Sequence, residues 1–140
     1  MDGTRTQGTS LLLDVSNALV VLHKQQFGRG PTRGRAYFGG PDVLVCVLEE
    51  VLLPAERKMV EFGEQQRVRE SRVAFQAATA SDFVAAVEGI VHRKVHAFAS
   101  GIDPDRDVVF ETFFFERDRN GDGHGALTAE TASELGAERH

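Results

Sequence analysis

Hydrophobic and polar positions follow a helical period in the first part of the chain, between Thr9 and Gly28. Thr9 or Ser10 is a suitable N-cap, and Gly28 is a typical residue to end a helix. Apolar residues recur three or four positions apart and form one stripe along the helix: Leu11, Val15, Ala18 and Leu22. Leu12, Leu19 and Val20 make this apolar face broader. The pattern predicts a first helix that is packed on more than one side.

A glycine- and proline-rich segment, residues 28–41, separates this helix from the next apolar run. Only a short strand, Arg35 to Phe38, fits between its turns. The run 42–52 that follows is apolar at successive positions, which predicts a strand covered on both faces. Pro54 is placed where proline is tolerated at the start of a helix, so we expect a helix over residues 54–62.

The second half of the chain predicts further helices and a hairpin. Residues 63–80 have a helical pattern, with Val68, Phe75 and Arg72 on a common side. Ser81 is interpreted as the N-cap of another helix that runs to residue 93 with a clean apolar stripe. Residues 94–100 and 108–116 are rich in β-branched and aromatic residues around a polar turn, as expected for two paired strands.

This order of elements predicts an α+β fold: α-β-β-α-α-(α)-β-β, with a four-stranded, mostly antiparallel sheet and helices packed on it. Residues 11–116 should form this single domain, after a flexible N-terminus at residues 1–10 and before an acidic, flexible tail at residues 117–140. Because the strand at 42–52 and the Phe113 to Phe115 run are apolar on both faces, the second sheet face needs a cover. Either the first helix or a second subunit would serve, and we expect a homodimer.

Charge is distributed unevenly along the 140 residues, whose net charge is −5. Residues 15–41 hold four basic and no acidic residues, whereas ten acidic and four basic residues follow from Asp103 onwards. An acidic protein is a poor general nucleic-acid binder, so no DNA partner is expected. The start of the chain lacks the apolar core of a signal peptide, and no apolar run approaches the ~20 residues that span a bilayer. We therefore expect a cytoplasmic protein.

Candidate metal and catalytic residues give little support for an enzyme. Asp118 to Glu130 is similar to a calcium loop, but the twelfth position is Ala129 and the required glutamate comes one residue late. His92 and His96 are separated by the start of a strand and should not form a zinc pair. The single Cys46 excludes an internal disulfide and is interpreted as a buried, inert thiol. No catalytic residue, metal ligand or cofactor is predicted.

The segment Gly-Arg-Gly-Pro-Thr-Arg-Gly-Arg, residues 28–35, has two interpretations. Glycines and arginines can present N–H groups and guanidinium forks to an anion, a nucleotide or a nucleic acid. Alternatively, the segment is a tight turn whose arginines are solvated or paired with carboxylates. A second basic group lies in the predicted helix over 63–80, where it is either a solvated face or a binding face. The candidate binding residues are Gly28, Arg29, Gly30, Pro31, Arg33, Arg69 and Arg72.

Three short stretches are the most specific parts of a wider pattern over about residues 11–116: Gly28 to Pro31, Leu53 to Glu56 and Ser100 to Asp103. This pattern resembles the MpsC-like family of small bacterial proteins, named for a sodium-translocating, membrane potential-generating system. The resemblance implies a non-enzymatic, cytoplasmic accessory or regulatory protein associated with membrane cation or bicarbonate transport, with a membrane transport subunit as partner. It also implies that Arg29 and its turn, with Arg69 and Arg72, form a partner- or anion-binding surface.

Overall fold

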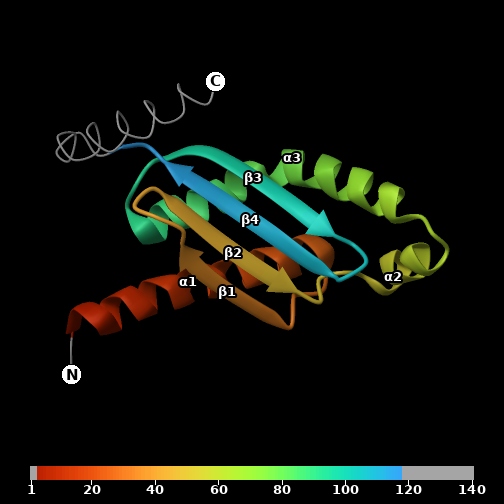
Figure 1. Ribbon diagram of the computed structural model, residues 1–140, viewed down its shortest axis with the longest axis horizontal. Coiled ribbons are helices and arrows are strands. Elements are labelled where there is room, and N and C mark those ends of the chain that lie inside the picture. Colours follow the sequence, from red (N-terminus) through yellow and green to blue (C-terminus); the bar gives the residue numbers. More distant parts are fainter. Residues whose placement is uncertain (1–2, 118–140) are drawn as a thin grey trace, which may run out of the picture.

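The computed structural model describes residues 3–117 of the chain, with side chains from residue 10 onwards, as three helices and four strands (Figure 1). The predicted acidic tail, including the calcium-like segment, lies outside these residues except for Arg117. In chain order the elements are α1 (Gly3–Phe27), β1 (Arg33–Phe38), β2 (Val43–Glu49), α2 (Pro54–Glu61), α3 (Gln65–Val91), β3 (Val95–Asp103) and β4 (Val108–Phe115).

The four strands form one antiparallel sheet in the order β1-β2-β4-β3. Each hairpin therefore contributes one central strand, and β2 pairs with β4 along its whole length, from Val43 opposite Phe114 to Glu49 opposite Val108. This arrangement confirms the predicted α+β fold with a four-stranded antiparallel sheet. It also places the two most apolar strands, β2 and β4, at the centre of the sheet, where each is paired along both edges.

The hydrophobic core lies between one face of the sheet and the two long helices, α1 and α3, which also pack on each other. Alternate residues of β2 and β4 point into it, so that Leu44, Cys46, Leu48, Phe113 and Phe115 are fully buried. The helices contribute a smaller set of buried apolar side chains: Val15 and Leu19 from α1, and Val68, Phe83 and Val87 from α3.

The opposite face of the sheet is not covered by any element within residues 3–117. In Figure 1 the strands lie in front of α1 and α3, which both pack on the far side. Side chains on the near side stay accessible, with Tyr37 47%, Phe110 44% and Phe114 39% exposed. The expectation that the first helix covers this face is therefore wrong, because the broad apolar surface of α1 is used against α3 and the core face.

The largest differences from the predicted boundaries are in the two long helices, while β1 begins at Arg33 and β3 extends to Asp103. The helix α1 begins at Gly3, before the predicted caps at Thr9 or Ser10. The predicted break at Ser81 is absent, because α3 is one continuous helix of 27 residues. Ser81 is exposed within it, between alanine-rich turns that favour the helix strongly enough to include a residue of neutral propensity. Two helices, rather than three, thus connect the two hairpins.

Gly34 in β1 packs closely against α1. A Cβ atom there would lie 2.9 Å from Val20 Cγ2 and 3.1 Å from Leu48 Cδ2. We expect Gly34→Ala to lower the free energy of unfolding by about 1–3 kcal/mol, because β-branched and packed neighbours cannot move aside without strain. Gly89 in α3, with nothing within 4 Å of an added Cβ, is the matched control.

For Gly89→Ala we expect a gain of about 0.5–1 kcal/mol, since alanine is the better helix former. Urea denaturation of both variants measures the two effects. Equal behaviour of the two alanine variants would contradict the tight α1–β1 contact.

Candidate functional site

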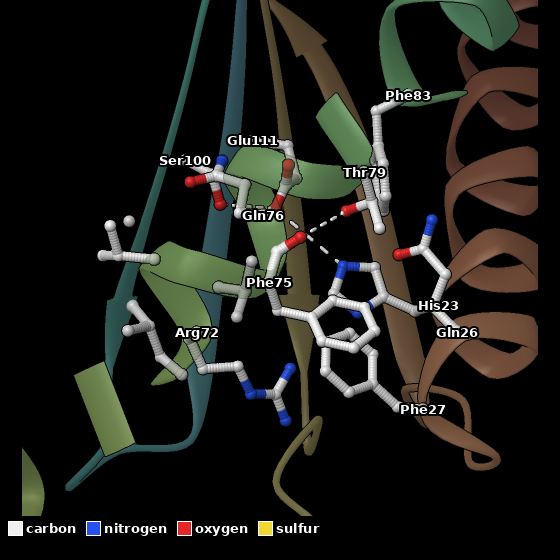
Figure 2. Close-up of a pocket in the computed structure, with 14 residues that line it drawn as sticks. His23, Gln26, Phe27, Arg72, Phe75, Gln76, Thr79, Phe83, Ser100 and Glu111 are labelled. Atoms are coloured by element: carbon white, nitrogen blue, oxygen red, sulfur yellow. Dashed lines mark hydrogen bonds and ion pairs between the residues drawn. The ribbon is translucent and has the colours of Figure 1, made fainter. Parts of the chain in front are cut away.

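A pocket lies between α1, α3 and the core-facing side of β3 and β4, with a cavity of about 50 Å³ (Figure 2). Such a volume holds a few water molecules or a small solute. Aromatic rings form much of its wall, and polar side chains from four different elements point into it. These polar residues include His23 and Gln26 from α1, Arg72 from α3, Ser100 from β3 and Glu111 from β4.

Several polar atoms around this pocket are buried and have no hydrogen-bond partner within the described part of the chain. They are His23 Nε2, Gln26 Nε2, Gln26 Oε1, Arg72 Nη1 and Glu111 Oε2. His23, Arg72 and Glu111 are only 5%, 7% and 2% exposed. Because an unsatisfied buried polar group costs about 1–3 kcal/mol, the fold maintains this cluster at the expense of stability.

One end of the pocket is built around Glu111. The Ser100 hydroxyl donates a hydrogen bond of 2.7 Å to Glu111 Oε1. His23 Nε2 lies 3.8 Å from the same oxygen, which is too long for a hydrogen bond but close enough for an ion pair when the imidazole is protonated. The His23 ring is held by Phe27, with which it stacks, and by Phe83, whose ring meets it edge-on at 5.3 Å. Glu111 Oε2 is thereby left for another partner.

The other end is built around Arg72. Its Nε and Nη2 atoms donate to the two carboxylate oxygens of Glu56 at 2.8 and 2.6 Å, and Nη2 also donates to the carbonyl of Val51 at 3.0 Å. The guanidinium carbon lies 4.1 Å from the centre of the Phe27 ring. These contacts fix the orientation of the guanidinium and leave Nη1 unpaired. Figure 2 shows Arg72 and Glu111 in separate parts of the pocket.

Comparison with known protein families identifies the chain. The model of a family described as "Na+-translocating membrane potential-generating system (MpsC)" matches residues 8–117. This chain belongs to the MpsC family. The match includes every strand, both later helices and most of α1, and it confirms the resemblance found in the sequence. Searches of curated proteins and of solved structures find no match.

Of the sequence stretches that resemble the MpsC family, one lines this pocket and another holds one of its side chains. Leu53 to Glu56 begins α2, where Glu56 accepts a hydrogen bond of 2.8 Å from the Leu53 backbone N–H and pairs with Arg72. Ser100 begins the second stretch and holds Glu111. Residues that are far apart in the MpsC sequence are therefore joined here by direct side-chain contacts.

The predicted binding residues of this MpsC-family protein are distributed over several places. Arg72 is buried at the pocket, whereas Arg69, three residues earlier on α3, is exposed. In the α1–β1 connection, Arg29 is half-buried and Arg33 is exposed at the start of β1. Gly28 has a φ of 76° and ends α1, while Gly30 and Pro31 continue the turn. The structure brings Arg72 close to Phe27, next to this turn, but a shared anion-binding surface stays a prediction.

Sequence reasoning missed His23, Gln26, Ser100 and Glu111. The sequence did contain an indication of Glu111. It alternates along β4 with Val109, Phe113 and Phe115, so its side chain points to the core face like theirs. A carboxylate at a core-facing position indicates a buried polar site. Its partners come from α1 and β3 and could be found only when the topology was known.

Cys46 is the cross-strand neighbour of Glu111 in the β2–β4 pair. Burial, with a smaller contribution from the Glu111 charge, raises the pKa of its thiol from 9.0 to about 12. A thiol with so high a pKa is not a nucleophile near neutral pH, in agreement with the interpretation of Cys46 as inert.

This pKa predicts a loss of stability in alkaline solution. Below pH 9 the thiol is protonated in both folded and unfolded chains, so its contribution is fully present. Between pH 9 and about 12 only the unfolded chain ionises, and the free energy of unfolding falls by about 1.4 kcal/mol per pH unit from this group. Urea titrations at pH 8, 9, 10 and 11 measure the free energy of unfolding of the wild type and of Cys46→Val. We expect it to fall less steeply with pH in Cys46→Val than in the wild type. Parallel curves for the two proteins would contradict the raised pKa.

Other kinds of site find no support in residues 3–117. Within that range no group of three or more His, Cys, Asp or Glu side chains is placed to hold a metal ion. None of the helices described here combines the length and the apolar character needed to cross a bilayer.

Proposed function

We propose that this protein is a non-enzymatic, cytoplasmic regulatory component of a Na+-translocating, membrane potential-generating system, and that it responds to a small solute held in the pocket. The link to such a system comes from the family description. The pocket role is supported chiefly by one observation: five unpaired, buried polar atoms gather around a single cavity. A fold that served only as a scaffold would gain stability by replacing them with apolar groups.

The unpaired atoms indicate the chemistry of the solute. Arg72 Nη1 and Gln26 Nε2 are donors, whereas Glu111 Oε2 and Gln26 Oε1 accept hydrogen bonds. The positive charge of Arg72 is already balanced by Glu56, so the cavity does not call for a simple anion. A short amino carboxylate fits best, with its carboxylate at Arg72, its ammonium group at Glu111 and its methylenes against Phe27 and Phe75.

Ordered water is the alternative occupant, since water also supplies both donors and acceptors. Thermal unfolding and isothermal titration calorimetry with glycine, β-alanine and γ-aminobutyrate distinguish the two. Acetate and methylammonium, which each carry one of the two groups, are the control solutes. We expect one amino carboxylate to raise the thermal midpoint, by the equivalent of about 2.7 kcal/mol at 100 times its Kd. No response to any member of the series would favour water.

Variants of the pocket test the assignment of atoms. Gln26→Leu should be at least as stable as the wild type without solute, because it removes two unpaired atoms, yet it should lose the response. Glu111→Gln should weaken binding of the ammonium group, whereas Glu116→Gln, on an exposed residue just beyond β4, serves as the control. A response that survives both pocket substitutions would place the solute elsewhere.

The regulatory role needs a test in cells. In a strain without this protein, the Na+-dependent membrane potential, measured with a potential-sensitive dye, should change and be restored by the wild type but not by Gln26→Leu. An unchanged potential in the deletion strain would contradict the role in the system. Full restoration by Gln26→Leu would contradict only the pocket role. Affinity capture from membrane fractions tests the expected transport subunit directly.

A further inference from the structure

The uncovered face of the sheet is largely apolar in its middle rows. Alternate residues of each strand point to it, as the register of the three strand pairs defines. In the middle rows, Tyr37 lies beside Val45, then Thr112 and Ala99, and Val47 lies beside Phe110. Adding Val43, Phe114 and Ala97 from the next row gives a continuous surface, which we call the open face.

Charges on the open face are placed toward one end: Arg35 lies beside Val47 at the β1 edge and pairs with Glu49 at 2.8 Å, and the remaining charges lie in the row beyond it. Arg33 pairs in register with Glu49, Glu49 with Val108, and Val108 with Asp103, so these four residues form one row across the sheet. Arg33 lies at one edge of that row and Asp103 at the other. Arg33 has no ion pair with another residue of the described range. Asp103 pairs with the guanidinium of Arg106, which is 79% exposed, and Asp103 Oδ1 also accepts a hydrogen bond of 3.2 Å from the Arg106 backbone N–H.

We propose that a second copy of this chain covers the open face, with the two-fold axis parallel to the strands. Under this axis β1 lies over the partner's β3, and β2 lies over the partner's β4. Each row of residues across the sheet then faces the same row of the partner. Arg33 of each copy then lies opposite the partner's Asp103, which gives two ion pairs across the interface. Two sheets packed in this way keep their strands within about 30° of each other and lie about 10 Å apart, as in a β-sandwich.

The same axis places large side chains opposite smaller ones of the partner in the middle of the open face. Tyr37 meets the partner's Ala99, a large residue against a small one, and Phe110 meets the partner's Val47. Aromatic and β-branched residues without charge are typical of the buried centre of an interface, and charged residues belong at its rim. The open face has both features in the positions that this symmetry requires.

Other covers fit less well. A two-fold axis across the strands would place β1 over the partner's β1 and reverse the rows. Arg33 and Asp103 would then no longer lie opposite each other, and the Arg35 side chains of both copies would share one edge, which like-charge repulsion disfavours. The chain's own residues 118–140 contain only two large apolar side chains, Leu127 and Leu135, among many charged and small ones. A segment of that composition cannot match an aromatic and valine-rich surface.

Sedimentation velocity of the full-length protein tests the proposal. We expect a dimer at micromolar concentration, and a Kd at least 100-fold weaker for Phe110→Asp, which buries a carboxylate at the centre of the interface. Phe62→Asp is the matched control, because Phe62 is 77% exposed and lies just after α2, away from the sheet. Circular dichroism confirms that each variant is folded.

The orientation is tested by reversing the charges. Arg33→Asp and Asp103→Arg should each weaken the dimer about tenfold or more, and the double variant should recover most of the wild-type affinity.

A wild-type monomer at high concentration would overturn the proposal, as would a dimer that Phe110→Asp leaves intact. Dimerisation that appears only after removal of residues 118–140 would show that the chain covers its own face, and would overturn it as well. A dimer that Phe110→Asp breaks but the charge variants leave unchanged would overturn the proposed axis.

Discussion

Replacing Arg72 with methionine should lower the free energy of unfolding by about 3–5 kcal/mol, because it leaves the partly buried Glu56 carboxylate without its charge partner. Arg72 is 7% exposed and makes three hydrogen bonds, two of them to Glu56 and one to the Val51 carbonyl. It also covers the Phe27 ring. One side chain of α3 therefore contacts the start of α2, the segment that follows β2 and the end of α1.

Urea denaturation of Arg72→Met measures this loss, with Arg69→Met as the matched control on the exposed side of the same helix. The control should change the free energy of unfolding by no more than about 0.5 kcal/mol. Adding Glu56→Gln to Arg72→Met should recover part of the loss, since an amide is less costly to leave unpaired than a carboxylate. A loss below 1 kcal/mol for Arg72→Met would mean that solvent replaces the ion pair easily.

Asp107→Ala is expected to have the second largest effect, a loss of about 2–4 kcal/mol. Asp107 Oδ1 accepts hydrogen bonds from the backbone N–H groups of Val51 and Leu52 at 2.7 and 2.9 Å. Both of these residues are only 2% exposed, so their N–H groups would be left unsatisfied. Asp107 also has a φ of 57°, a conformation that aspartate and asparagine adopt more readily than alanine.

Asp107→Asn separates these contributions. Asparagine keeps an acceptor oxygen and tolerates the positive φ, and it loses only the ion pair with Arg57, whose side chain is 44% exposed. We expect a cost below about 1 kcal/mol for this variant. Thermal unfolding of Asp107→Ala, Asp107→Asn and the exposed control Asp82→Ala ranks the three. Equal losses for the alanine and asparagine variants would contradict the role given to the two N–H groups.

Local patterns along the sequence predicted most of the elements but not their arrangement. The backbone preferences of Pro54 and Gly28 predicted a helix start and a helix end. Both predictions are confirmed, since α2 begins at Pro54 and α1 ends at Phe27. The common side of Val68 and Arg72 on α3 also followed from helical spacing. Ser81 misled because a capping residue is also acceptable inside a helix when its neighbours are strong helix formers.

The pocket could not be predicted in the same way, because it depends on contacts between distant segments. Arg72 was selected as a basic residue of a binding surface, but its buried ion pair with Glu56 and its place at the pocket could not be read from the sequence. His23 has the spacing of a core residue on α1 and is indeed buried, but its partner Glu111 lies 88 positions further along the chain. Only the strand order places α1, α3 and β4 around the same cavity.

The strand order also determines when this protein can become stable during synthesis. β4 is the last strand among residues 3–117, yet it lies in the sheet between β2 and β3, and it pairs with residues of β2 that are roughly 60 to 70 positions earlier. A nascent chain that ends at β3 therefore has two separate strand groups and no continuous sheet. The folded state becomes available only after Phe115 has left the ribosome, and its formation is a single, late and cooperative event.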